Sequence, residues 1–179
     1  MTCLDNSWKC ISCPSPLFLR GYTCYSTCPS PYYGITTKNT CELDCLSNQF
    51  KHDVDRICYE NCPANYFTDP STKKCVTVCP SPYYAIKATS ICDSDCPSYQ
   101  FKYDIDRICY ASCPINFYGN PITGLCENSC PNGMFDTASN ICEYCYFNCK
   151  NCKGTAINCV DCKYGWVLSG NSCIIPASK

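Results

Sequence analysis

The chain has 179 residues, of which 24 are cysteine, and a net charge of −1 with a single histidine. Leu, Ile, Val and Phe together supply only 32 residues, below the roughly 20% that a conventional hydrophobic core needs. The balanced charge argues against nucleic acid as a partner, and no run of about 18 apolar residues predicts a membrane span. This cysteine content is instead typical of a disulfide scaffold formed in an oxidising compartment.

The cysteines of the central part of the chain repeat with a period of 17 residues. A fixed period predicts a repeat array whose units bury their faces against their neighbours. A second period of 51 residues, or three units, is superimposed on the first, because residues 28–63 and 79–114 agree at 22 of 36 positions. We call three successive units a triplet, and two triplets related by this period sister triplets. The repeating C-x3-C pairs are Cys24/Cys28, Cys41/Cys45, Cys58/Cys62, Cys75/Cys79, Cys92/Cys96, Cys109/Cys113 and Cys126/Cys130.

Each repeat is expected to form a small β-finger of two short strands and a turn, with strands at 32–35, 65–68 and 83–86. A proline follows the second cysteine of most pairs, where its missing N–H suits the first residue or the edge of a strand. The fifth residue after that cysteine is always aromatic. We expect its ring to pack on the disulfide of its own or the neighbouring finger. The rings belong to Tyr33, Phe50, Phe67, Tyr84, Phe101, Tyr118 and Phe135.

Two pairings of the repeating cysteines are open. Each C-x3-C can close on itself, or the second cysteine of one pair can join the first of the next across the finger. We favour the second, because the two feet of a β-hairpin lie within the ~4.4–6.8 Å Cα separation that a disulfide needs. This pairing predicts Cys28–Cys41, Cys45–Cys58, Cys62–Cys75, Cys79–Cys92, Cys96–Cys109, Cys113–Cys126 and Cys130–Cys142.

The stretch C-x2-C-x10-C-x3-C-P from Cys10 to Cys28 resembles the cysteine-rich region of furin-like and growth-factor-receptor proteins. The cysteine spacing between Cys142 and Cys162 resembles it too, and long arrays of this kind are similar to predicted surface proteins of ciliated protists. The resemblance implies single-disulfide fingers that alternate with modules of interlaced disulfides. The links that it implies outside the repeat are Cys13–Cys24, Cys145–Cys152, Cys149–Cys159 and Cys162–Cys173.

The two ends of the chain share one cysteine spacing. Cys3, Cys10, Cys13 and Cys24 correspond to Cys152, Cys159, Cys162 and Cys173. We therefore expect the chain to start in the middle of a module, without a signal peptide, as either a fragment of a longer array or a unit that assembles head to tail. In the family pattern the partners of Cys3 and Cys10 precede Met1, so within this chain these two are left to pair with each other.

The predicted fold is a small, disulfide-rich, all-β protein: an elongated rod of stacked 17-residue fingers. Residues 1–27 form a partial furin-like end module and 28–142 seven single-disulfide fingers. Residues 143–173 form a furin-like module with interlaced disulfides, and 174–179 a loose tail.

Several residues suggest other chemistry. The C-x2-C pairs at Cys10, Cys142, Cys149 and Cys159 have zinc-ligand spacing, but the surrounding C-x3-C lattice favours disulfides. Asp53 and Asp55, followed by Arg56, form a D-x-D that falls short of the six or more oxygens of a calcium site, and we expect a turn or a local ion pair. The same residues recur as Asp104, Asp106 and Arg107.

His52 is replaced by Tyr103 in the sister triplet, so we interpret it as a finger residue and expect no catalytic residue, metal or cofactor. Trp8, Trp166 and the Tyr-Tyr pairs suit either stacking or a ligand-binding face. O-linked sugar at the finger tips is compatible with Thr36, Thr37, Thr72 and Thr123.

The expected function is that of an extracellular or cell-surface structural protein that is not an enzyme: a stiff stalk, a surface coat or a filament subunit that partners itself head to tail. The alternative is a receptor-type ectodomain for a protein or glycan ligand, whose site we expect where the pattern breaks, at 142–173. Neither hypothesis involves nucleic acid.

Overall fold

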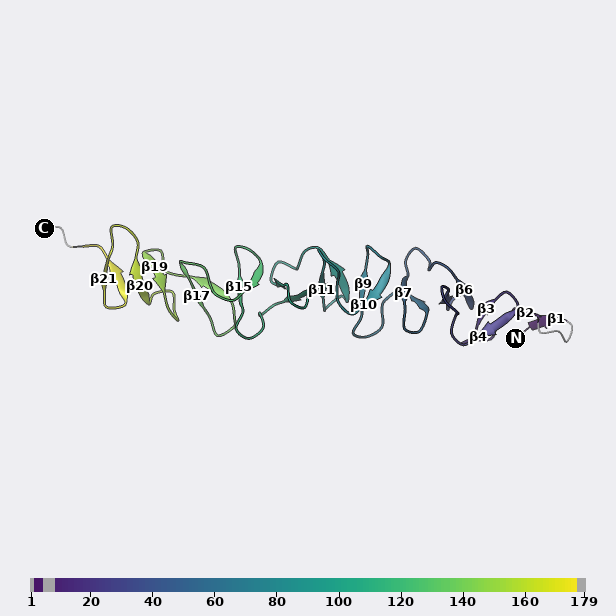
Figure 1. The fold of residues 1–179 in the computed structure, drawn as a ribbon. Helices are drawn as coiled ribbons and strands as arrows, with labels where there is room; N and C mark the ends of the chain where they lie inside the picture. The colour runs from purple at the N-terminus through teal and green to yellow at the C-terminus, as the bar shows by residue number, and fades with distance from the viewer. Residues whose placement is uncertain (1, 5–8, 177–179) are drawn as a thin grey trace. The chain divides into compact units, whose positions relative to one another are not determined.

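The structure, a computed structural model, describes residues 2–4 and 9–176 and is all-β across them. It forms two compact units, Met1–Asp93 and Ser94–Lys179, and Figure 1 labels many of their strands. The first unit contains β1 (Thr2–Leu4), β2 (Lys9–Ser12), β3 (Phe18–Arg20), β4 (Thr23–Tyr25), β5 (Tyr33–Ile35), β6 (Thr40–Glu42), β7 (Phe50–His52), β8 (Ile57–Tyr59), β9 (Phe67–Asp69), β10 (Lys74–Val76), β11 (Tyr84–Ile86) and β12 (Ile91–Asp93). The second contains β13 (Phe101–Tyr103), β14 (Ile108–Tyr110), β15 (Tyr118–Asn120), β16 (Leu125–Glu127), β17 (Met134–Asp136), β18 (Cys142–Tyr144), β19 (Cys149–Cys152), β20 (Cys159–Cys162), β21 (Val167–Ser169) and β22 (Ser172–Ile174).

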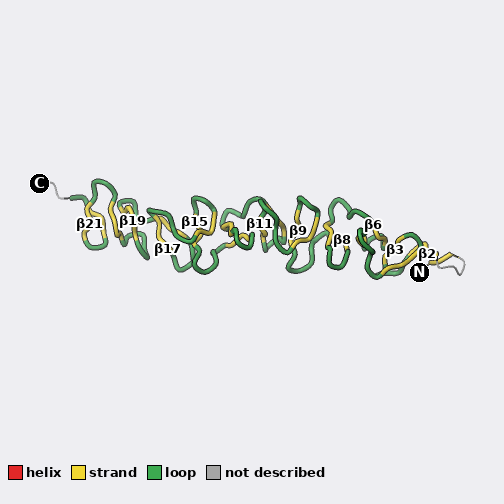
Figure 2. The backbone as a smooth tube through the Cα atoms, in the orientation of Figure 1, coloured by secondary structure: helices red, strands yellow, loops and turns green. Residues whose placement is uncertain are grey.

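Each 17-residue repeat forms one antiparallel hairpin. In the first finger Tyr33 lies opposite Glu42, Gly34 opposite Cys41 and Ile35 opposite Thr40. The same register recurs in the following fingers of both units. Strands of three residues are too short to be stable alone, so the disulfide that ties the second strand of each hairpin to a cysteine ahead of its first strand supplies the missing constraint. Figure 2 shows these short strands separated by longer turns.

A β-turn precedes the first strand of each finger. The proline therefore lies in this turn, ahead of the strand, and not at the first residue or the edge of the strand as expected. The Pro29 carbonyl accepts a hydrogen bond from the Tyr32 N–H at 2.8 Å, so the proline opens a turn and the strand starts at Tyr33. The turn is made in different ways: through cis peptides such as Ser30–Pro31, or through Asn65, whose φ is 68°. The predicted strands 32–35, 65–68 and 83–86 therefore began one or two residues too early.

A left-handed residue just before each second strand links one finger to the next. Its φ is positive, from 51° at Asn39 to 69° at Gly124. This conformation presents its carbonyl to the N–H of the middle residue in the preceding finger's first strand, at 2.7–2.9 Å. The bonded pairs are Leu19 with Asn39, Gly34 with Arg56, Lys51 with Lys73 and Thr68 with Ser90 in the first unit, and Lys102 with Gly124 and Gly119 with Asn140 in the second.

These links order the strands within each unit. In the first unit the sheet runs β11-β12-β9-β10-β7-β8-β5-β6-β3-β4, and in the second β15-β16-β13-β14. Antiparallel pairs within fingers alternate with parallel contacts between fingers, such as β3 with β6 and β9 with β12. The repeat therefore propagates through nearest-neighbour contacts.

Ser90 offers a test of the left-handed position. Substitution of Ser90 by Val should destabilise its finger by about 1–2 kcal/mol, since a β-branched residue is strained at positive φ, whereas Ser90→Gly should be tolerated. Unfolding by urea measures the effect. Ala88→Val, in the same exposed turn without a positive φ, is the matched control. Equal losses for the two valine variants would contradict the prediction.

The core is made largely of disulfides. Among the described residues 23 apolar side chains are buried, and 15 of them are cysteines. The others are isolated rings and aliphatic residues such as Ile35, which is 1% exposed. No helix in the described part of the chain is long and apolar enough to cross a membrane.

Candidate functional site

The disulfides form one link per finger. All seven fingers are closed across the hairpin, with Cα–Cα distances of 5.5–5.7 Å, and no C-x3-C pair closes on itself. The links are Cys28–Cys41, Cys45–Cys58, Cys62–Cys75, Cys79–Cys92, Cys96–Cys109, Cys113–Cys126 and Cys130–Cys142. The linked cysteines are not opposed in the hairpin, because Cys41 lies opposite Gly34. Cys28 lies before the turn that joins Pro29 to Tyr32, so this turn and the hairpin together bring the two cysteines within bonding distance.

The end modules contain the pairs that the family resemblance implied. These are Cys13–Cys24, Cys145–Cys152, Cys149–Cys159 and Cys162–Cys173. The backbone places Cys3 opposite Cys10 across β1 and β2, and Cys10 is disulfide-bonded. The side chain of Cys3 lies outside the described residues, as does Trp8, so the Cys3–Cys10 link stays a prediction.

The sulfurs of Cys149, Cys159 and Cys173 lie within 4.8 Å of one another, close enough for a shared metal ion. All three are in disulfides, and a disulfide sulfur is not the thiolate that binds zinc. In this oxidised state the cluster is therefore part of a hydrophobic core, where it packs with Phe135 and Trp166.

Three aromatic rings at the repeat spacing pack on the disulfides that follow them in the chain. Tyr33 clusters with Cys45 and Cys58, and Phe135 with the disulfides of the C-terminal module. Phe18 makes the same contact with Cys28 and Cys41. Phe18 was not predicted as a repeat aromatic, although it too is the fifth residue after a cysteine, Cys13. Of the seven rings predicted from the repeat, Tyr33, Tyr84 and Phe135 are buried, and Phe50, Phe67, Phe101 and Tyr118 are partly buried.

Two glycines let rings approach the next finger closely. A Cβ at Gly34 would lie 2.6 Å from the Phe18 ring, and one at Gly119 would lie 2.4 Å from the Phe101 ring. The ring and the inter-finger hydrogen bond thus meet at the middle residue of the same strand.

A polar network ties three successive fingers of the first unit together. The Tyr33 hydroxyl donates to the Asp53 carboxylate, which also pairs with the Lys74 ammonium at 2.9 Å. The Arg56 guanidinium lies 4.2 Å from the centre of the Tyr33 ring. The hydrogen bonds from Tyr33 and Lys74 lower the pKa of Asp53, while burial and the bond to Asp53 raise the pKa of Tyr33.

The second carboxylate of the D-x-D is used inside its own finger. Asp55 accepts hydrogen bonds from the Ile57 N–H, the Tyr59 hydroxyl and His52 Nδ1. Burial, followed by the bond to Asp55, raises the pKa of Tyr59 to about 12. Asp53 and Asp55 thus face different partners and do not form a shared cation site.

The sister finger repeats the arrangement. Asp106 accepts from the Ile108 N–H and the Tyr110 hydroxyl, and Arg107 lies 3.8 Å from Asp104. His52 and Tyr103 both make edge contacts with two rings, His52 with Tyr59 and Tyr66. His52 is therefore an aromatic packing residue, which explains why tyrosine replaces it.

Asp69 is a buried carboxylate, 1% exposed, at the start of its finger turn. Burial acts to raise its pKa, but hydrogen bonds from Ser71 and Thr72 outweigh burial and hold the pKa below the usual value. In the sister triplet Asn120 occupies this place and accepts from the Ile122 N–H. Thr72, like Thr36, Thr37 and Thr123, lies exposed in a finger turn.

Acid should therefore weaken the fold through Asp69. A carboxylate with a lowered folded-state pKa stabilises the protein above its ordinary pKa of about 3.9, and this stabilisation is lost as pH falls through the folded-state value. We expect Asp69→Asn to be less stable than the parent at neutral pH and the difference to shrink on acidification. Urea unfolding across pH measures it, with Asp44→Asn on the exposed surface as the control. A difference independent of pH would contradict the prediction.

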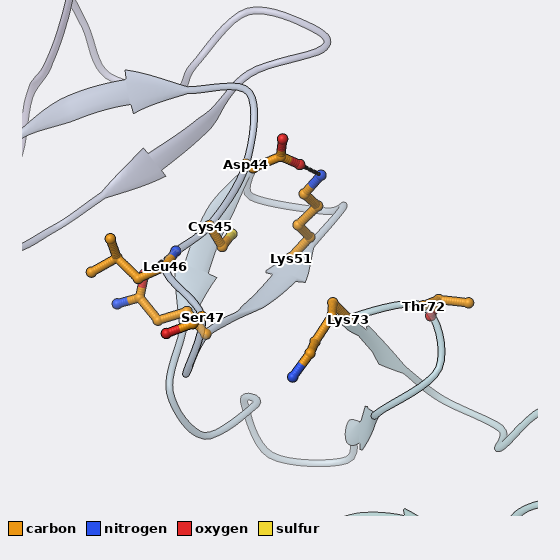
Figure 3. Close-up of a pocket in the computed structure, with 8 residues that line it drawn as sticks. Asp44, Cys45, Leu46, Ser47, Lys51, Thr72 and Lys73 are labelled. Carbon is orange, nitrogen blue, oxygen red and sulfur yellow. Dashed lines mark hydrogen bonds and ion pairs between the residues drawn. The ribbon is translucent and has the colours of Figure 1, made fainter.

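Shallow hollows lie between successive fingers. Figure 3 shows one of about 300 Å³, lined by Leu46, Lys51 and Lys73 among others. Lys51 pairs with Asp44 at 2.7 Å, and Lys73 lies over the Phe50 ring, so both cations are engaged. A similar hollow of about 260 Å³ recurs one finger along. Because the hollow recurs between successive fingers, we interpret it as a consequence of their stacking and not as a specialised site.

The C-terminal module differs from the fingers in its surface. Between residues 144 and 175 large apolar side chains stand exposed, among them Phe147 at 61% and Ile157 at 66%. Tyr146, Phe147 and Trp166 form a ring cluster with centroid separations of 4.7 and 5.6 Å. The pattern break at 142–173 thus coincides with an exposed aromatic face.

No protein-family model, curated protein or solved structure matches this chain. The geometry defines its class: a disulfide-rich β-repeat protein that forms in an oxidising compartment. Its fold fits an extracellular structural protein or an ectodomain.

Proposed function

We propose that this chain is an extracellular structural repeat protein, a spacer made of stacked fingers, and that it has no enzymatic activity. The observation that supports it is the repetition of one junction. In each unit the N–H to carbonyl bond between fingers recurs at 2.7–2.9 Å. Where the clusters are described, a ring covers the next disulfide as well.

Such a junction suits a load-bearing or spacing role. Only three residues separate the last cysteine of one finger's disulfide from the first cysteine of the next finger's disulfide. The chain between two fingers is therefore short and has little conformational freedom. Because each finger contacts its neighbours alone, the length of the array can change without a new core. A stalk, a surface coat or a filament subunit would each use this property, and the filament would use self-association of copies head to tail.

An in-register deletion tests the proposal. Removal of residues 46–96 deletes one triplet and joins Cys45 to Pro97, so the C-x3-C-P pattern is kept. We expect an oxidised, monodisperse particle whose long dimension in electron microscopy is shorter than that of the parent. Removal of residues 46–70, which is out of register, is the matched control and should give mispaired, aggregated material. A compact parent particle whose dimensions the triplet deletion leaves unchanged would refute the spacer role.

A further inference from the structure

Two disulfides of the C-terminal module lie next to each other. Cys149–Cys159 joins β19 to β20, and Cys162–Cys173 joins the end of β20 to β22 in the last finger, at the yellow end of the ribbon in Figure 1. The sulfurs of Cys149, Cys159 and Cys173 all lie within 4.8 Å of one another, and the described part of the chain contains no second group of three cysteine sulfurs this close. One sulfur of the second disulfide is therefore a neighbour of both sulfurs of the first.

The backbone of the module also fits a second pairing of the same four cysteines. Cys149 and Cys162 lie opposite each other across β19 and β20. Opposed residues of an antiparallel pair have Cα atoms about 4.5–5.5 Å apart, within the roughly 4.4–6.8 Å that a disulfide needs. If Cys149 joins Cys162, the two cysteines that remain are Cys159 and Cys173, whose sulfurs are already neighbours. The strands therefore need not separate for the second pairing to form.

The four cysteines differ in their exposure, and this difference selects the sulfur that a thiol from solution attacks. Cys149 is 1% exposed, Cys159 3% and Cys173 4%, whereas Cys162 is partly exposed. Thiol–disulfide exchange depends on access to the attacked sulfur, so Cys162 is the point of entry. Its leaving group is then Cys173, the sulfur that lies beside the other disulfide.

We propose that the C-terminal module is a thiol–disulfide exchange site for a small monothiol such as glutathione, a role beyond that of a spacer. The exchange moves the attachment of β22 from the end of β20, at Cys162, to its start, at Cys159. It therefore changes how the last finger is fixed to the module. The pairs Cys149–Cys159 and Cys162–Cys173 become Cys149–Cys162 and Cys159–Cys173.

The exchange proceeds through three displacements. The thiolate of the monothiol attacks Cys162 Sγ, forms a mixed disulfide with it and releases the Cys173 thiolate. Cys173 attacks Cys159 Sγ, which forms the Cys159–Cys173 bond and releases the Cys149 thiolate. Cys149 attacks Cys162 Sγ in the mixed disulfide, which forms the Cys149–Cys162 bond and expels the monothiol as its thiolate. The number of disulfides is unchanged and the monothiol is regenerated, so the exchange consumes no oxidant or reductant.

Disulfide mapping on the full oxidised chain tests the proposal. The chain is incubated with substoichiometric glutathione and quenched in acid, its thiols are blocked, and the linked peptides are identified by mass spectrometry. Proteolysis places the four cysteines on separate peptides by cleavage at Phe147, Lys150, Lys153, Asp161 and Lys163. We expect peptides linked by Cys149–Cys162 and Cys159–Cys173 to appear at an unchanged intact mass, while the fingers keep their pairing. Original pairs alone would overturn the proposal, as would equal rearrangement in the fingers, which would indicate general scrambling.

A serine variant tests whether the neighbouring sulfur is what makes the exchange possible. Cys149→Ser leaves the Cys159 thiol beside the Cys162–Cys173 disulfide. We expect this thiol to attack Cys173 Sγ without any added monothiol and to release the Cys162 thiol. Labelling of the thiols in denaturant after an acid quench should therefore find label on Cys162 as well as on Cys159.

Cys79→Ser is the matched control. It leaves the Cys92 thiol in a single-disulfide finger, where the structure shows no comparable group of sulfurs, so the label should stay on Cys92. Label confined to Cys159 in the first variant would refute the proposed site, as would an equal spread of label from Cys92 in the control. The mapping of the parent chain does not depend on the folding of either variant.

Discussion

Full reduction of the disulfides is expected to unfold the chain at neutral pH without denaturant. Fifteen of the 23 buried apolar residues described are cysteines, so few side chains remain to hold the fold once the links are cut. Each loop of about 15 residues that a disulfide closes contributes roughly 3 kcal/mol in the chain-entropy model. Eleven such links are described, and their summed contribution exceeds the roughly 5–15 kcal/mol net stability of an ordinary domain. Circular dichroism and hydrogen exchange measure the loss.

A chain alkylated without prior reduction is the control, and it should keep the native spectrum and take up no label. The same comparison distinguishes disulfides from metal sites, since chelation alone should then change nothing. A reduced chain that kept protected amides would show that side-chain packing suffices, and it would contradict the account of the core given above.

Removal of the Phe135 ring should have the largest effect of any single packing substitution in the second unit. Phe135 is 7% exposed and packs on Cys149, Cys152 and Cys159, so its ring joins the last finger to the C-terminal module. Deletion of a buried phenylalanine side chain costs about 3–5 kcal/mol. We expect Phe135→Ala to open the module locally, with faster hydrogen exchange and proteolysis over residues 134–162.

Phe147→Ala is the matched control, because the same substitution removes a ring that is 61% exposed. It should change stability by no more than about 0.5 kcal/mol, as is usual for surface positions. Comparable losses in the two variants would show that the Phe135 contact is not what holds the module to the finger.

The sequence indicated the repeat and the two feet of each finger because both depend on short-range geometry. The hairpin places Cys75 opposite Thr68, and the turn at Pro63 returns Cys62 toward it, all within 13 residues of chain. The strand starts were less accurate, since the turn at Pro63 uses Asn65 in a left-handed conformation, which strand propensity does not reveal. The aromatic spacing indicated a ring on a disulfide but left the choice of disulfide open.

What the sequence determined by itself is the covalent frame: a 17-residue unit, its hairpin, and a composition that needs cross-links in place of an oily core. Only the tertiary structure decided which disulfides Phe18, Tyr33 and Phe135 cover and which carbonyl joins successive fingers. The physical reason is that cysteine spacing constrains atoms through the chain, whereas these contacts join residues of different fingers or strands. Their partners follow from backbone direction and packing in space, which periodicity does not encode.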